Sequence, residues 1–280
     1  VALDGASVYA GGGFASVGGS TRAHVAQIDA ASGVATAWDP SASDAVTAIA
    51  VAGDVVYLGG RFSQIGGTAR SHAAAVHRTT AALRPWDPNA DDTVLALSVS
   101  GGTVYMGGEF LNIGGALRLH AAAVDAVSGA ASTWHPALND PVRTITATAD
   151  LVAVGGSFEA LGAYPRRNLA AIDLETGRLL PWNPRPDSAV LALEVAGDRR
   201  VYVGGNFTAV ARQSRARLAA FDLPTFTLTS WNPGADAQVL ALASFTDPAG
   251  VTTVYAGGEF ATAGGAARSR LAAIGGASGL

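Results

Sequence analysis

Arginine is the charged residue that recurs at a fixed place throughout this chain. It stands eight residues after the phenylalanine that closes a repeated Val-Tyr-x-Gly-Gly-x-Phe motif. A guanidinium group presents its N–H donors as a planar fork, which matches the oxygens of a carboxylate or a sulfate in a bidentate geometry. The six arginines are Arg22, Arg70, Arg118, Arg166, Arg215 and Arg268.

A second polar position follows each arginine by two residues. It holds His24, His72, His120, Asn168, Arg217 and Arg270. If a strand has started at the arginine, the two side chains point to the same face. Six copies around an axis would then form a ring of cations that binds carboxylates, sulfates or an acidic peptide. The spacing therefore predicts ligand contact at the arginines of both positions and at the three histidines.

The same arginines also have a structural interpretation. In an antiparallel meander, the loop that carries the arginine and the loop between repeats lie at one end of the sheet. The loops between repeats contain Asp44, Asp92, Asp140, Asp187 and Asp236. Arginines paired with these carboxylates, or with loop carbonyl groups, would fasten the sheets, and a partly buried pair is worth more than an exposed one. This interpretation predicts that Arg118→Ala lowers stability more than a substitution at Arg199.

The sequence contains none of the common catalytic or metal-binding patterns. It has no Gly-x-Ser-x-Gly elbow, no His-Glu-x-x-His motif and no phosphate-binding glycine loop. Cysteine is absent, which excludes disulfides, thiolate metal sites and cysteine nucleophiles. His72 and His77 are five residues apart on an expected strand and would point to opposite faces. The aspartate-rich loops lack the dense spacing of a calcium loop. We therefore expect no catalytic residues, no metal and no cofactor.

Composition narrows the choice of partner. The net charge is −4, and all 18 basic residues are arginine. A negative chain has no general attraction for nucleic acid. No apolar stretch approaches the roughly 18 residues that suggest a membrane span. We expect a protein or glycan ligand, without nucleic acid and without membrane insertion.

Short strands are the elements that must position these residues. Successive copies of the glycine motif lie 48, 48, 48, 49 and 53 residues apart, and a fixed period of this length indicates a repeat architecture. In the second copy, the apolar segments 46–51, 55–58, 72–76 and 83–86 are separated by turn signals such as Gly53-Asp54. Consecutive apolar residues are typical of strands covered on both faces. The pattern predicts an all-β, six-bladed β-propeller with four-stranded antiparallel blades and about 48 residues per repeat.

One propeller domain, 1–280, accounts for the whole chain. Its expected units are 1–44, 45–92, 93–140, 141–188, 189–237 and 238–280. A tryptophan follows the phenylalanine of a unit by 24 residues and precedes a proline by two. We interpret these tryptophans as apolar plates between neighbouring blades, at the end of an outer strand where proline does no harm. They are Trp38, Trp86, Trp134, Trp182 and Trp231.

The sixth unit has no such tryptophan, because Leu280 stands where its outer strand would begin. We expect the last blade to lack its outer strand. Alternatively, the chain is a piece of a longer protein that supplies the missing strand.

The repeats resemble the kelch motif and the delta-sixty β-propeller repeats of large bacterial surface proteins. The resemblance rests on Val-Tyr-x-Gly-Gly, on a strand ending in aspartate as in 171–173, on Thr176-Gly177, and on Trp182-Asn183-Pro184. It covers the whole chain and implies a β-propeller. Three positions depart from the pattern: Ala153 replaces tyrosine, Ala211-Arg212 replaces a second glycine pair, and His77 replaces the strand-ending aspartate.

Together these observations predict a non-catalytic binding or scaffolding module. Ligand contact is expected on the face with the long loops, near the axis, because binding residues concentrate on loops held by rigid elements. The family resemblance implies a secreted or cell-surface location and a place in a larger surface protein. One alternative is an enzyme acting on a glycan, or another hydrolase or lyase, with an axial site. Another is a purely structural repeat of an adhesin or fibre.

Overall fold

The computed structural model describes residues 1–197, 199–223 and 225–279. Throughout these residues the regular elements are β-strands, paired antiparallel, and no helix is present. The chain divides into two compact units, Val1–Ala137 and Leu138–Leu280, and each unit contains three copies of the glycine motif. The all-β, antiparallel prediction is confirmed.

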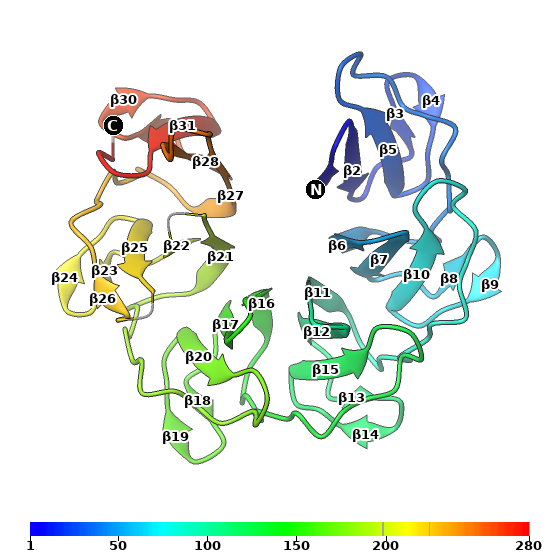
Figure 1. The fold of residues 1–280 in the computed structure, drawn as a ribbon, viewed down its shortest axis with the longest axis horizontal. Helices are drawn as coiled ribbons and strands as arrows, with labels where there is room; N and C mark the ends of the chain where they lie inside the picture. The colour runs from blue at the N-terminus through cyan, green and yellow to red at the C-terminus, as the bar shows by residue number, and fades with distance from the viewer. Residues whose placement is uncertain (198, 224, 280) are drawn as a thin grey trace. The chain divides into compact units, whose positions relative to one another are not determined.

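The first unit contains three main sheets, which follow one another along the chain (Figure 1). Their strands are β1 (Ala2–Asp4), β2 (Ser7–Gly11) and β5 (Val25–Asp29); β6 (Val46–Ala52), β7 (Val55–Gly60) and β10 (Ala73–His77); and β11 (Val94–Ser100), β12 (Thr103–Gly108) and β15 (Ala121–Asp125).

The second unit repeats this arrangement. Its strands are β16 (Val142–Ala147), β17 (Leu151–Gly156) and β20 (Leu169–Asp173); β21 (Val190–Val195), β22 (Arg200–Gly205), β25 (Leu218–Asp222) and β26 (Thr227–Leu228); and β27 (Val239–Thr246), β28 (Thr252–Gly258) and β31 (Leu271–Gly275).

Within each unit, the first strand of a sheet lies beside the first strand of the next, as with β6 and β11 or β16 and β21 (Figure 1). The core fills the space between consecutive sheets. One apolar cluster joins Ala73 and Ala75 of β10 to Val104 and Met106 of β12. Alanines on the third strand allow this close approach, which explains the consecutive apolar residues seen in the sequence.

The double glycine permits the same close packing. A Cβ atom on Gly59 would lie 2.6 Å from Cγ1 of Val94 in the next sheet, and one on Gly60 would lie 2.2 Å from the carbonyl oxygen of Ala45. Neither glycine has a positive φ. The motif therefore needs glycine for contact distance and not for backbone conformation.

In the first unit, tyrosine and tryptophan fasten the second sheet to the third. The rings of Tyr57 and Trp86 meet edge to face at 5.1 Å and 72°. Trp86 Nε1 donates to the carbonyl of Asp125 at 2.9 Å, and the Tyr57 hydroxyl donates to the carbonyl of Ala126 at 2.8 Å. Asp125 is the last residue of β15, in the third sheet, and Ala126 follows it. The tryptophans thus act as plates between sheets, as their spacing predicted.

The fourth strand is shorter than predicted in the first four sheets. In the first four sheets the outer segment pairs with the third strand through a single bridge, such as Val76 with Leu83. Only the fifth sheet has a paired fourth strand, β26, in the described ranges. Trp134 stands nine positions after Asp125, and a tight turn uses most of the residues between them before the tryptophan and proline redirect the chain.

The predicted long loop between the second and third strands is an ordered two-stranded hairpin in every repeat. Paired glycines such as Gly66 and Gly67 supply the positive φ at its tip, whereas the fifth repeat uses Ala211 and Arg212 at φ 50° and 62°. The hairpins are β3 (Ser16–Val17) with β4 (Ser20–Thr21), β8 (Gln64–Ile65) with β9 (Thr68–Ala69), β13 (Asn112–Ile113) with β14 (Ala116–Leu117), β18 (Ala160–Leu161) with β19 (Tyr164–Pro165), β23 (Ala209–Val210) with β24 (Gln213–Ser214), and β29 (Thr262–Ala263) with β30 (Ala266–Ala267).

Candidate functional site

The predicted arginines directly follow these hairpins and bond to backbone carbonyl groups. Arg70 Nη1 donates to the carbonyl of Ala69 at 2.8 Å, and its Nη2 donates to the carbonyl of Arg84 in the outer segment at 3.0 Å. This pair of bonds joins the hairpin to the outer edge of the same sheet. Arg22, Arg118 and Arg215 bond in the same way, to the carbonyls of Thr21 and Thr36, Leu117 and Ser132, and Ser214 and Thr229.

The other two arginines of the set differ. In the part of the chain that the structure describes, the guanidinium of Arg166 bonds only to the carbonyl of Pro165, at 2.9 Å, and that of Arg268 only to the carbonyl of Ala267, at 3.2 Å. Arg215 is 8% exposed, so its guanidinium has little free surface for a ligand. Ligand contact at the six arginines stays a prediction.

The carboxylates near these arginines are not those predicted. Arg22 and Arg70 lie 4.0 and 3.8 Å from Asp39 and Asp87, which follow the tryptophans. Asp44 instead accepts a hydrogen bond from the N–H of the next residue, and Asp92 does the same. In these two repeats, the aspartate that follows the tryptophan is therefore the carboxylate near the arginine.

The second polar position does not lie on a strand. His120 has φ 60°, in the left-handed region, and its N–H donates to the carbonyl of Phe110 at 3.0 Å. Because the third strand starts one residue later, the expectation that this side chain shares a strand face with the arginine is wrong. The other five members have the same conformation: His24, His72, Asn168, Arg217 and Arg270.

A repeated polar cap was missed by sequence reasoning. Asp91 Oδ1 accepts the N–H groups of Leu111 and Asn112, each at 2.9 Å, and so holds the start of the β13–β14 hairpin. Equivalent bonds are made by Ser43, Asn139, Asp187 and Asp236. The signal was present, because Ser, Asp or Asn stands three residues before the valine that opens the first strand of repeats two to six.

Electrostatics agree with a structural role for these caps. The N–H of Thr262 is the main cause of the lowered pKa of Asp236, because a hydrogen bond to the carboxylate favours its charged form.

A different carboxylate, Glu194 on β21, accepts the N–H and the hydroxyl of Ser244 on β27, at 3.0 and 2.7 Å. Burial raises the pKa of Glu194. It joins the first strands of two neighbouring sheets.

A charged cavity of about 600 Å³ lies beside the β18–β19 hairpin. Its lining includes Glu159, Arg167, Arg185 and Asp187. Glu159 and Arg167 are exposed and 3.9 Å apart. The cavity therefore offers both signs of charge at the end of the sheets where the hairpins lie.

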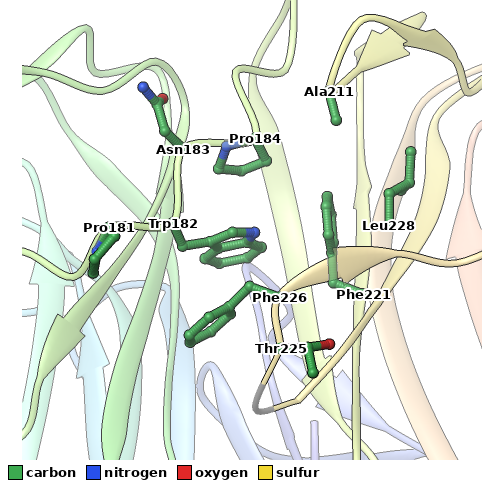
Figure 2. A pocket seen from close by; sticks show the side chains of 9 residues that line it. All are labelled: Pro181, Trp182, Asn183, Pro184, Ala211, Phe221, Thr225, Phe226 and Leu228. Carbon is green, nitrogen blue, oxygen red and sulfur yellow. The ribbon is translucent and has the colours of Figure 1, made fainter.

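A second, uncharged cavity of about 360 Å³ lies between the outer edges of the fourth and fifth sheets (Figure 2). Trp182 meets Phe221 edge to face at 5.0 Å and 82°, and it stacks on Phe226 at 5.2 Å and 24°. Pro181, Asn183, Pro184, Ala211, Thr225 and Leu228 complete the lining. Two atoms of this lining, Trp182 Nε1 and Asn183 Oδ1, are buried and have no hydrogen-bond partner among the described residues.

The described ranges contain neither a cluster of metal-binding side chains nor a membrane-spanning helix. No group of three or more histidine and carboxylate side chains is placed to hold a metal ion. No helix there is long and apolar enough to cross a membrane.

Comparison with known proteins identifies the fold. No family model matches the chain, and no curated protein matches it in sequence. Among solved structures, it is similar to the WD40 β-propeller domain of Doa1, with a TM-score of 0.57, 11% identity, and coverage of 82% of this chain and 67% of that one.

Two further structures agree in fold. A chain of the mitotic checkpoint complex gives a TM-score of 0.56 at 15% identity, with 82% of this chain and 64% of that chain covered. The computationally designed Ika8 protein gives 0.52 at 15% identity, with 82% and 74% covered. The protein is therefore a β-propeller in fold.

Proposed function

We propose that this protein is a non-catalytic binding or scaffolding module built as a six-bladed β-propeller of the kelch-like or delta-sixty type. Six copies of one sheet, each with one hairpin between its second and third strands, support the blade number. The packing of first strand beside first strand within each unit is the contact that a propeller repeats around its axis.

The observation that carries the binding function is the contrast between a constant frame and variable hairpin residues. The caps and the arginine–carbonyl bonds recur, whereas the exposed residues of the hairpins differ from repeat to repeat. Leu117, Tyr164 and Gln213 are examples, and all three are exposed. A rigid frame that presents variable side chains is the usual basis of a binding surface. The charged cavity lies on this surface and is large enough for a ligand group.

A protein ligand is favoured over a glycan. One structure of the same fold belongs to a mitotic checkpoint complex, which is a protein assembly. The charged cavity offers Arg167 and Arg185 together with Glu159 and Asp187, and such mixed charges suit a peptide that carries both signs. The arginines of the repeated set would then act as frame residues.

A location outside the cell, within a larger surface protein, is also part of the proposal, and it rests on the family resemblance of the repeats. Fractionation of the native host cell with an antibody against this chain tests it. Recovery in the cytosolic fraction would contradict this part alone.

A binding screen tests the function. Arrays of acidic and mixed-charge peptides and of glycans are probed with the wild type and with an Arg167→Glu/Arg185→Glu variant. We expect peptide ligands whose binding is lost in the double variant. Arg199→Ala is the matched control, because Arg199 is an exposed arginine in the turn before β22, at the opposite end of the sheet. Ligands that bind both variants like the wild type would contradict a hairpin-face site.

A further inference from the structure

The fourth tryptophan breaks a hydrogen bond that its counterparts make. Trp38, Trp86 and Trp231 each donate the indole N–H to a carbonyl of the next sheet, at 2.9 to 3.0 Å. Trp182 is only 6% exposed, yet its Nε1 has no partner among the residues the structure describes. A buried donor without a partner is unfavourable, and native proteins rarely keep one without a reason.

Phe226 accounts for the missing bond. It occupies the turn position that holds Gly33, Gly129, Gly177 and Gly279 in other repeats, and it adopts a left-handed φ of 57°. Its N–H still closes the turn on the carbonyl of Asp222, at 2.7 Å. Its ring, however, stacks on the indole of Trp182. An aromatic residue in this backbone region is strained, and such strain concentrates at ligand sites.

Two more substitutions fall at the same place. Ala153 stands where other repeats have the tyrosine that meets the tryptophan edge. Phe221, from the next sheet, supplies that edge contact instead. Other repeats have isoleucine or valine at the position of Phe221. Phe221 and Phe226 line one cavity with Trp182 (Figure 2), and Ala153 belongs to the apolar cluster that contains Trp182 and Phe221. This clustering separates the cavity from the frame that all repeats share.

The lining defines the chemistry of the ligand. None of its nine residues is charged, so anionic or cationic groups find no counter-charge. Three aromatic rings, two prolines and a leucine offer apolar contact. The unpartnered atoms are one donor, Trp182 Nε1–H, and one acceptor, Asn183 Oδ1. A peptide carries one acceptor and one donor in its backbone C=O and N–H. A sugar would bring several hydroxyl groups, and most of them would stay unpaired here.

We propose that the cavity between the outer edges of the fourth and fifth sheets binds an uncharged, proline-containing peptide segment of a partner protein. A proline ring packs against the aromatic side chains, a peptide carbonyl accepts the Trp182 N–H, and a neighbouring peptide N–H donates to Asn183 Oδ1. Proline-rich segments suit such a site because they are already extended before binding and aromatic grooves recognise them. Phe226 moves off the indole when the peptide enters. The residues that line this site differ from those that line the charged cavity, and the proposal does not require the protein to have six blades.

Indole N–H resonances of ¹⁵N-labelled protein test the proposal. Loss of one signal in Trp182→Phe assigns the resonance, and Trp86→Phe identifies an indole already bonded to a carbonyl. The probes are N-acetyl-Pro-Leu-Pro-amide and, separately, cellotriose, each at about 1 mM, which detects weak binding. We expect the tripeptide to shift the Trp182 signal saturably and more than the Trp86 signal. No shift with the tripeptide, or a shift with cellotriose alone, would overturn the proposal.

Phe226→Gly gives an independent test. Glycine accepts the left-handed backbone without strain, so the fold is retained. We expect the tripeptide to bind at least about tenfold more weakly, because one aromatic wall is removed. Thr227→Ala is the control, since Thr227 is the exposed first residue of β26, directly after Phe226, and does not line the cavity. Unchanged affinity in Phe226→Gly would refute the site even if Trp182 responded to the peptide.

Discussion

Substitution of two equivalent arginines separates a fastening role from a ligand role. Arg215 donates to the carbonyls of Ser214 and Thr229, each at 2.8 Å, and is 8% exposed. Arg166 occupies the same place one repeat earlier but bonds only to Pro165 in the described ranges. The two sites therefore differ by the bond that joins the hairpin to the outer segment.

The size of the effect follows from this difference. A hydrogen bond that involves a charged group contributes about 1.5–3 kcal/mol. We expect Arg215→Ala to lower the free energy of unfolding by about 1.5–3 kcal/mol more than Arg166→Ala does. Arg215→Met keeps much of the apolar stem and should recover only the packing part of the loss. In a chain of this size each kcal/mol corresponds to about 2–4 °C in melting temperature.

Urea unfolding followed by circular dichroism measures both variants, and thermal melts give the second estimate. Because Arg215 and Arg166 lie in the same compact unit, the comparison is not affected by differences between the units. Equal losses in the two alanine variants would refute the fastening role. Retained stability with loss of a ligand identified in the array screen would instead assign Arg215 to binding.

Three further substitutions probe the frame. Glu194→Gln should stabilise the protein at about pH 8 and have little effect at about pH 4. Because the pKa of Glu194 is raised in the folded state, this residue contributes stability below the ordinary glutamate pKa, and the contribution is lost as the pH rises through the folded pKa. Urea unfolding at both pH values measures the difference. Gly60→Ala should cost about 3 kcal/mol or more, because its Cβ would overlap a backbone carbonyl, whereas Gly13→Ala meets no atom within 4 Å and should be nearly neutral in thermal melts. Trp86→Phe should lower the unfolding free energy by about 1 kcal/mol more than Trp182→Phe does, because only Trp86 loses a hydrogen bond.

Each of these expectations has a contrary result. If wild type and Glu194→Gln differ in stability by the same amount at both pH values, the pKa of the Glu194 carboxyl is not raised in the folded protein. Equal melting temperatures for the Gly60 and Gly13 variants would mean that the sheets can separate to admit a methyl group. Equal losses for the two tryptophan variants would show that the hydrogen bond of Trp86 does not contribute to holding the sheets together.

Much of the fold could be predicted from the sequence because each repeat contains its own turn signals. The fixed spacing located the strands, the glycine pair and the tryptophan plates, and these depend on residues near one another in the chain. The length of the outer strand was overestimated, because apolar residues such as Leu83 mark the segment but not how soon the chain turns away. The hairpins were expected as loops, although paired glycines such as Gly66-Gly67 mark their tips.

The candidate site was less predictable. The arginines were found, but their acceptors are backbone carbonyls such as that of Arg84. Because every residue has a backbone carbonyl, the sequence does not show which one accepts the bond. The strand start was placed one residue too early because a left-handed histidine such as His120 looks like any strand residue in a sequence. The Asp91-type caps had a sequence signal, a polar residue three places before the first strand, that was read only as part of an acidic loop.

The sequence by itself determined that the chain repeats one β-sheet unit six times and that double glycines mark the closest contacts, because local spacing and residue size express both. Only the tertiary structure decided which repeat departs from the others in its packing and hydrogen bonding. Trp182, Phe221 and Phe226 are far apart along two repeats, and their types alone do not show that an indole N–H loses its acceptor. That loss depends on the direction of a ring in a left-handed turn, which is set by packing between sheets.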